Sequence, residues 1–292
     1  MMQSIAMPSR IVFGHHSKAT GELWSNMSDI CELLKIEAPS NLDKDLRQFQ
    51  HRRFKAGQTL HLPNDALDNL FLVNCGFLKS SMTDDNGNEL VLNFPMKGEL
   101  IGVDSVHLRR HQSATITLSD CDIILIPYAA ILELTEEYVQ LGQALLHIMS
   151  RELARERYIL GPQRTLSAEA KIGRFLCMMG ERYAQLGYSS RRFNLRMSRN
   201  EIANYLGLAI ETVSRVLCVF HRLGVITVHQ REVVIIDAEF LRGLIKLSTS
   251  RNKPMTDTGK KNLKNDRLIS DLSLVHVADR HTGTTMSGVS HM

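Results

Sequence analysis

The chain has 292 residues, enough for about two domains, and its 43% hydrophobic and 23% charged residues are ordinary for a globular protein. Its formal net charge of +4 is mildly basic, which is compatible with a polyanionic partner but does not identify one. No apolar run is long enough to span a membrane, no signal-peptide core is present, and the five scattered cysteines do not form a disulfide framework, so we expect a cytoplasmic protein with no membrane partner.

The N-terminal half is predicted to be a β domain. Residues 1–30 are polar and lack periodicity, so an irregular extension is expected there. Short apolar segments then alternate with glycines and with turn signals such as residues 84–87, as far as residue 127. This spacing is typical of an antiparallel sandwich or roll, and residues 31–127 are assigned to that domain.

Residues 128–160 are predicted to form one long helix with two apolar stripes. The first stripe follows alternating steps of four and three residues and becomes charged at Glu152 and Arg155. The second stripe contains Leu146, Met149 and Leu153. Two stripes indicate two contacts, one with the β domain and one with an identical helix across a two-fold axis. The alternative is an amphipathic helix that lies only on its own domain. The candidate dimerisation residues are Leu141, Leu145, Ile148 and Ile159.

The C-terminal half is predicted to be a helical domain followed by a tail. Gly161 and Pro162 end the long helix, and another helix is expected over residues 167–186. Residues 161–249 are assigned to this domain. The segment 250–292 is polar with few large apolar residues, so it is predicted to be a disordered tail.

A helix-turn-helix pattern lies inside this domain. Ser198 and Glu201 form a capping-box pattern that starts a helix, and Gly207 suits a left-handed turn after it. A second helix is expected from about Ala209. Its inner face contains Val213, Val216, Leu217 and Phe220. Two apolar segments around a polar turn at residues 229–232 then predict a β-hairpin wing.

The outer face of the second helix has the chemistry of a DNA-reading surface. Arg215 can present two donors to guanine, Glu211 can accept from cytosine, and Ser214 can contact base edges or phosphate. A helix with such groups near its N-terminal end suits the major groove. The candidate DNA-binding residues are Ser198, Arg199, Glu211, Thr212, Ser214 and Arg215.

The motif resembles the CRP/FNR family of bacterial regulators. Glu201-Ile-Ala-Asn-Tyr-Leu-Gly-Leu followed by Glu211-Thr-Val-Ser-Arg is similar to the FNR branch, and Gly98-Glu-Leu-Ile-Gly resembles the family's central glycine turn. The resemblance covers about residues 30–247 and implies an α+β fold: an antiparallel cyclic-nucleotide-binding-type β-roll, a long dimerisation helix and a C-terminal winged helix-turn-helix. It also implies a homodimer on an inverted repeat with half-sites similar to TTGAT, and contact with RNA polymerase. Ala209 departs from the family's usual threonine, and loss of that cap costs about 1 kcal/mol.

The sequence leaves the effector open. Cyclic-nucleotide-binding members share an Arg-Ser/Thr-Ala segment, where this chain has Gln112-Ser113-Ala114, although Arg109 and Arg110 are nearby. An FNR-like iron–sulfur cluster needs four thiolates, and only Cys31 and Cys121 lie at or near the places that the resemblance implies. Haem needs an axial ligand and an apolar pocket. The histidines available for haem are His15, His16, His51, His61, His107, His111 and His147. We therefore expect no standard cluster, and assign no metal ligands or cofactor.

Two other classes of protein were weighed. An enzyme or ligand-binding protein on the same β-roll has no support, because the chain lacks a nucleophile–base pattern and metal-ligand spacing. A winged helix that binds protein instead of DNA is disfavoured by the outward set of Glu211, Ser214 and Arg215. The prediction is therefore a transcription regulator that is not an enzyme.

Overall fold

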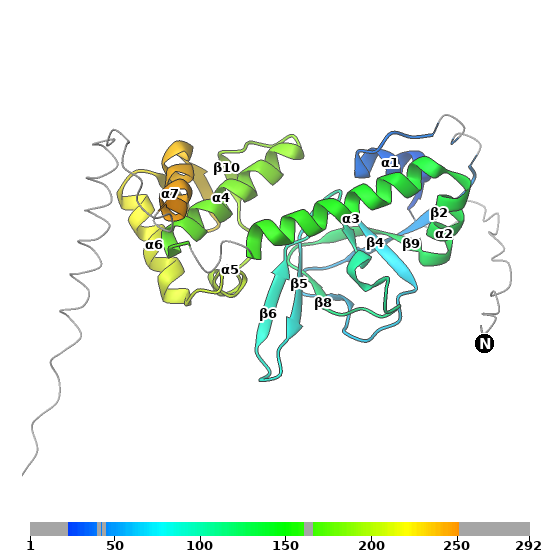
Figure 1. Cartoon of the computed structure of the whole chain (residues 1–292), viewed down its shortest axis with the longest axis horizontal. Helices are drawn as coiled ribbons and strands as arrows, with labels where there is room; N and C mark the ends of the chain where they lie inside the picture. The colour runs from blue at the N-terminus through cyan, green and yellow to red at the C-terminus, as the bar shows by residue number, and fades with distance from the viewer. Residues whose placement is uncertain (1–22, 40–41, 43–44, 161–165, 251–292) are drawn as a thin grey trace, which may run out of the picture.

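The computed structural model describes residues 23–39, 42, 45–160 and 166–250 (Figure 1). The β domain lies along one side of the helix α3 (Val139–Leu160), and a smaller, mostly helical domain lies beyond the C-terminal end of this helix. Most of the irregular N-terminal extension and almost all of the disordered tail predicted above lie outside the described residues.

The N-terminal domain is an antiparallel β-roll, as predicted. One sheet has the order β1-β2-β9-β4-β7 and the other has the order β3-β8-β5-β6. Every strand pair in both sheets is antiparallel. The strands are β1 (Trp24–Asn26), β2 (Gln48–Phe54), β3 (Thr59–His61), β4 (Asn69–Cys75), β5 (Leu78–Thr83), β6 (Glu89–Asn93), β7 (Leu100–Ile101), β8 (Ala114–Thr117) and β9 (Cys121–Pro127). The central strands β4 and β9 are almost fully buried, which explains why they read as continuous apolar runs.

The N-terminal boundary of this domain differs from the prediction. Trp24–Asn26 pairs with β2, and a helix α1 (Met27–Leu34) follows it directly. Asn26 and Asp29 form the capping box that starts α1, and the helix buries Met27, Ile30 and Cys31. The prediction of irregular structure is therefore wrong for residues 24–30. A three-residue strand and an eight-residue helix are too short to produce a clear periodic pattern.

The predicted single helix over residues 128–160 is also corrected. The chain forms α2 (Tyr128–Glu137) and then α3, with Tyr138 between them in an extended conformation. Leu134, Tyr138 and Leu141 nevertheless belong to one buried cluster against the β-roll. Because the apolar spacing continues through the break, periodicity could not reveal it.

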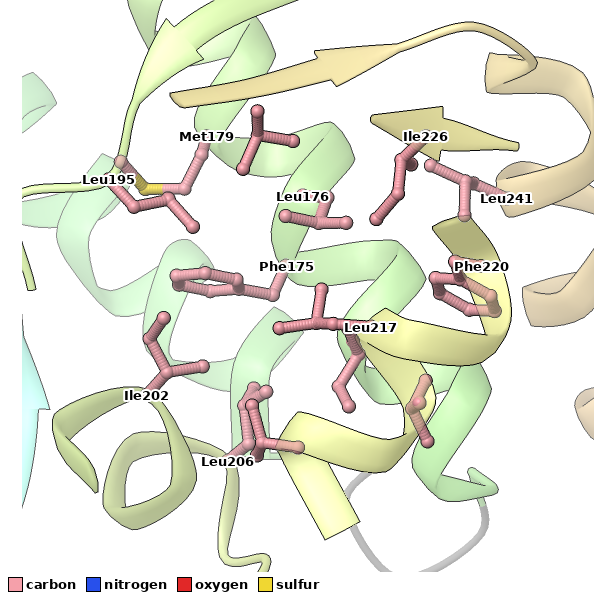
Figure 2. Close-up of a cluster of buried hydrophobic side chains, with 14 of the residues drawn as sticks. Phe175, Leu176, Met179, Leu195, Ile202, Leu206, Leu217, Phe220, Ile226 and Leu241 are labelled. Carbon is pink, nitrogen blue, oxygen red and sulfur yellow. The ribbon is translucent and has the colours of Figure 1, made fainter. Parts of the chain in front are cut away.

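The C-terminal domain is a winged helix, as predicted. Its helices are α4 (Ala168–Gln185), α5 (Arg199–Leu206), α6 (Ile210–Arg222) and α7 (Ala238–Ser250). Its strands β10 (Arg192–Asn194), β11 (Ile226–His229) and β12 (Glu232–Ile235) form a sheet of order β10-β12-β11. Figure 2 shows that Phe175 and Leu176 of α4 meet Leu217 and Phe220 of α6 in the core of this domain.

A membrane span is not supported by any single helix in the described ranges. Two consecutive helices, Arg199–Leu206 and Ile210–Arg222, are together long and apolar enough to cross a membrane. They are, however, bent by 104° relative to each other. These two helices form the helix-turn-helix.

A pair of buried histidines lies in the β-roll. The rings of His61 and His111 stack with their centroids 3.8 Å apart, and His61 also stacks on Phe71. Neither ring nitrogen of His61 has a hydrogen-bond partner among the described residues. Burial, together with the neighbouring His111, lowers the pKa of His61 to about 4. The folded protein therefore keeps this ring neutral at mildly acidic pH.

We expect the β-roll to lose stability as the pH falls from about 6.5 to about 4. In this window His61 is protonated in the unfolded chain but stays neutral in the folded chain. The loss of folding free energy therefore increases as the pH falls. The lowered pKa corresponds to about 3 kcal/mol at the acid end of the window. Urea unfolding across this pH range would measure it, with His61→Phe expected to reduce the dependence.

The exposed His107 supplies the control, since His107→Gln should leave the pH dependence of the wild type unchanged. The pKa of His111 is also lowered by burial, so some dependence should remain in His61→Phe. If His61→Phe and the wild type lost stability equally, the histidine pair would not be the source.

Candidate nucleic-acid interface

The first helix of the helix-turn-helix is capped as predicted. Ser198 Oγ accepts a hydrogen bond from the Glu201 amide at 3.2 Å, and Glu201 Oε2 accepts one from the Ser198 amide at 2.7 Å. Gly207 closes α5 in the left-handed conformation, with φ 60° and ψ 47°. The resulting turn sets α6 at 104° to α5. These local features set α6 as a separate helix at a fixed angle to α5.

The outer face of α6 is directed to solvent. Val213, Val216 and Phe220 are buried on the inner face. Glu211, Ser214 and Arg215 are exposed, and Thr212 is half-buried. The structure therefore brings the predicted reading residues together near the N-terminal end of α6. An exposed arginine and glutamate one turn apart form a face of fixed geometry that can be inserted into a major groove.

The start of α6 lacks a side-chain cap. Ala209 occupies the N-cap position in an extended conformation and makes no side-chain hydrogen bond. The first amides of an α-helix have no partners within the helix, and they favour anions such as phosphate. The absent cap leaves these donors to solvent or to DNA.

Ser198 and Arg199 lie at the start of α5. Ser198 is exposed, although its hydroxyl already takes part in the capping box. Arg199 is half-buried, and burial lowers the pKa of its guanidinium. Both residues are therefore better suited to contacts at the phosphate backbone than to reading base edges.

The wing adds basic side chains that the sequence pattern did not single out. Gln230 adopts a φ of 53° in the tight turn between β11 and β12. Arg231, which follows it, donates to the Arg196 carbonyl at 2.9 Å. Arg192 pairs with Glu232 at 2.8 Å. Arg192, Arg196 and Arg231 are exposed. Of these three, Arg231 alone lies in the polar turn that the sequence pattern marked.

Much of the face of α3 that was assigned to dimerisation packs within its own chain. Leu141 and Ile148 are buried within this chain, and Leu145 lines the same apolar cavity between α1, α2, α3 and the β-roll. The side chain of Ile159 lies outside the described residues. Periodicity identified two stripes but could not tell which of them faces the β-roll. The exposed stripe contains Val139, Leu146, Met149 and Leu153.

The candidate cluster ligands are not brought together. Cys31 lies in the core cluster under α1, and Cys121 lies in a different cluster of the β-roll. Burial raises the pKa of both thiols, which opposes the thiolate form that binds metal. The described residues contain no group of three or more histidine, cysteine or acidic side chains placed to hold a metal. These residues do not fit a four-thiolate cluster.

The residues expected near a bound nucleotide are already engaged within the chain. Arg109 lies over the ring of Tyr128 at 3.9 Å, and Arg110 donates to the Asn64 carbonyl at 2.8 Å. The side-chain Nε2 of Gln112 donates to the Arg110 carbonyl at 2.9 Å. The residues weighed as substitutes for a phosphate-binding arginine therefore have other partners.

Comparisons with known proteins agree with this architecture. Residues 170–244 match the family model described as a Crp-like helix-turn-helix domain, and residues 51–138 match a cyclic nucleotide-binding domain. The transcriptional regulatory protein btr of Bordetella pertussis is 38% identical over 72% of this chain and 88% of its own length. The transcriptional activator protein anr of Pseudomonas aeruginosa is 33% identical over 70% and 83%. The structure of FixK2 from Bradyrhizobium japonicum has a similar fold, with a TM-score of 0.62 at 22% identity, over 67% of this chain and 96% of that one.

Proposed function

Because this chain belongs to the CRP/FNR family of DNA-binding transcription regulators, we propose that it binds an inverted repeat as a two-fold dimer and acts from there on RNA polymerase. The observation that carries the proposal is the exposed set of Glu211, Ser214 and Arg215 on the outer face of α6. These side chains have the donors and acceptors that distinguish one base pair from another in the major groove.

The dimer is proposed to form through the exposed stripe of α3. Val139, Leu146 and Leu153 recur every seven residues, and Met149 lies on the same face. Large apolar side chains at this spacing are typical of a helix that pairs with an identical helix. A two-fold axis along α3 presents two copies of α6 to one face of the DNA, about 34 Å apart.

The half-sites are proposed to be similar to TTGAT, as the FNR-like reading residues imply. The name of the Pseudomonas aeruginosa relative, a transcriptional activator, supports activation through RNA polymerase. We infer that the protein works in the cytoplasm as a regulator and not as an enzyme. No ligand is needed to build the dimer or the reading face in this proposal.

The test is specific DNA binding by protein purified in air. We expect the inverted repeat to bind at least about 10³-fold more tightly than a scrambled repeat at the same salt concentration. Replacing either Cys31 or Cys121 by alanine should leave this ratio unchanged, because neither thiol has cluster partners among the residues that the structure describes. Fluorescence anisotropy with labelled duplexes would measure both affinities.

Protein purified without oxygen would show whether a cofactor is required for DNA binding. A preparation with about four irons per chain that loses iron and DNA binding together in air would contradict the cofactor-free proposal. Equal affinity for the inverted and scrambled repeats would contradict sequence-specific recognition itself.

A further inference from the structure

One mostly buried carboxylate, that of Glu99 with its side chain 19% exposed, joins three parts of the chain. Glu99 lies in the turn between β6 and β7, and its Oε1 accepts from Arg155 Nη1 at 3.1 Å and from Arg182 Nη2 at 2.8 Å. Its Oε2 lies 2.9 Å from the same Arg182 nitrogen. Arg155 belongs to α3 and Arg182 to α4. These three residues, the Glu99 junction, therefore connect the β-roll, the helix assigned to dimerisation and the DNA-binding domain.

The β-roll side of the Glu99 junction is rigid. The Gly98 amide donates to the Val73 carbonyl at 2.8 Å, and the Val73 amide donates to the Glu99 carbonyl at 3.0 Å. Gly98 has a φ of 81°, and a Cβ there would lie 2.9 Å from the Leu33 carbonyl oxygen. Glu99 Oε2 also accepts from the Met96 amide at 3.3 Å. Contacts within the β-roll therefore help to hold the carboxylate in position beside the two arginines.

The arginine from the DNA-binding domain, Arg182, is buried at the Glu99 junction. Arg182 is only 8% exposed, and its Nη2 also donates to the Phe94 carbonyl at 2.6 Å. A buried guanidinium that loses its carboxylate keeps the cost of desolvation without the compensating attraction. Without Glu99, Arg155 keeps Glu152 at 3.4 Å, whereas Arg182 loses its carboxylate partner and keeps the Phe94 carbonyl. We therefore expect removal of Glu99 to weaken the contact between the β-roll and the DNA-binding domain.

A second set of contacts holds α5 against the β5–β6 hairpin. Lys79 of β5 pairs with Glu201 of α5 at 3.1 Å. Asn204 of α5 accepts from the Val91 amide at 2.7 Å and donates to the Glu89 carbonyl. Figure 1 shows this hairpin beside α5, with α6 on the far side of the domain. The docked arrangement therefore leaves the reading face of α6 free.

We propose that the Glu99 junction is a positioning device that fixes the DNA-binding domain relative to α3 and thereby sets which distance between half-sites the dimer accepts. Arg155 lies on the helix that runs along the proposed two-fold axis, and Arg182 lies on the first helix of the DNA-binding domain. Two DNA-binding domains held at one separation bind a repeat of matching spacing more tightly, because little further ordering of the domains is needed on binding. The proposal rests on the proposed dimer at an inverted repeat.

The test compares spacing preference in the full-length wild type and in Glu99→Gln. The DNA set holds a single half-site and inverted repeats whose spacer is changed one base pair at a time. Two correctly spaced half-sites should raise wild-type affinity about 10²- to 10⁴-fold over one half-site, and incorrect spacers should lose this gain. In Glu99→Gln we expect the gain at the preferred spacer to fall at least about 10-fold, with similar affinities at all spacers. Affinity for one half-site should not change.

Asp120→Asn is the matched control. It also removes a β-roll carboxylate, but one that pairs with Lys55 at the surface and joins no second domain. This control should keep the wild-type optimum. If Glu99→Gln does not fold by circular dichroism, Asn204→Ala provides the second variant, since it removes the two Asn204 contacts with the hairpin and leaves the Lys79–Glu201 pair. A broader spacer range is expected there too.

A direct measurement of position does not depend on DNA. Spin labels on the exposed Cys218 of α6, in a Cys75→Ser background, report the distance between the two reading helices of a dimer. A narrow wild-type distribution that broadens in Glu99→Gln supports the proposal. A folded Glu99→Gln protein that keeps both the narrow distribution and the sharp spacer optimum overturns it. Wild-type protein that prefers no inverted repeat would instead overturn the proposed function.

Discussion

Replacing Leu146 and Leu153 together by glutamate is expected to convert the protein to a monomer that binds the inverted repeat about 10²- to 10⁴-fold more weakly. Leu146 is 68% exposed and Leu153 is 55% exposed, so neither supports the fold of the single chain. In the proposed dimer each side chain meets its symmetry mate, and a glutamate there would lose apolar burial and face a like charge. Size-exclusion chromatography with light scattering would measure the mass, and anisotropy would measure the affinity.

Leu132 gives the matched control for this variant. It is 45% exposed on α2, a separate helix before the break at Tyr138, so Leu132→Glu should remain a dimer with full affinity. Ile148→Glu is not an equivalent test, because Ile148 is 3% exposed and a buried charge there would damage the fold. A Leu146→Glu/Leu153→Glu protein that stayed dimeric and bound the repeat normally would exclude this face of α3 from the interface.

Replacing Arg215 by alanine is expected to cost about 1–3 kcal/mol of DNA-binding free energy per half-site and to relax selectivity at one base pair. Arg215 is exposed on α6, so the change should leave the free energy of unfolding nearly unaffected. Glu211→Ala should relax selectivity at a different base pair, since its carboxylate accepts where the guanidinium donates. Competition binding against every single-base variant of the half-site would measure both profiles at fixed salt.

Arg222→Ala is the control for charge alone. Arg222 is exposed at the C-terminal end of the same helix, distant from the reading end. Its loss should weaken binding to all sequences by a similar, smaller factor and reduce the salt dependence. If Arg215→Ala produced this uniform pattern, Arg215 would be a phosphate contact, and base reading would have to be assigned to other residues.

Local signals were sufficient for the helix-turn-helix. Ser198, Glu201 and Gly207 act within one or two turns of the chain, where the cap and the left-handed turn depend on neighbouring residues only. The outer face of α6 followed from the same helical period that placed Val213 and Phe220 inside. The order of the β-roll segments was also visible, because glycines and turn residues mark the ends of short strands.

Short or interrupted elements were not recognisable in this way. Helix α1 has only eight residues, and the break at Tyr138 leaves the apolar spacing intact. Their existence depends on what the neighbouring strands and helices bury, which no window of the sequence contains.

The sequence by itself therefore determined the reading face of α6. A helical period of 3.6 residues places Glu211, Ser214 and Arg215 on one side of the helix wherever the domain lies. The role of the α3 stripes was not determined in this way, because both are apolar and only packing against the β-roll buries Ile148 while leaving Leu146 exposed. The Glu99 junction was equally hidden: Glu99 is 56 residues from Arg155 and 83 from Arg182. A charge finds such a partner only when folding brings separate elements together and removes the water between them.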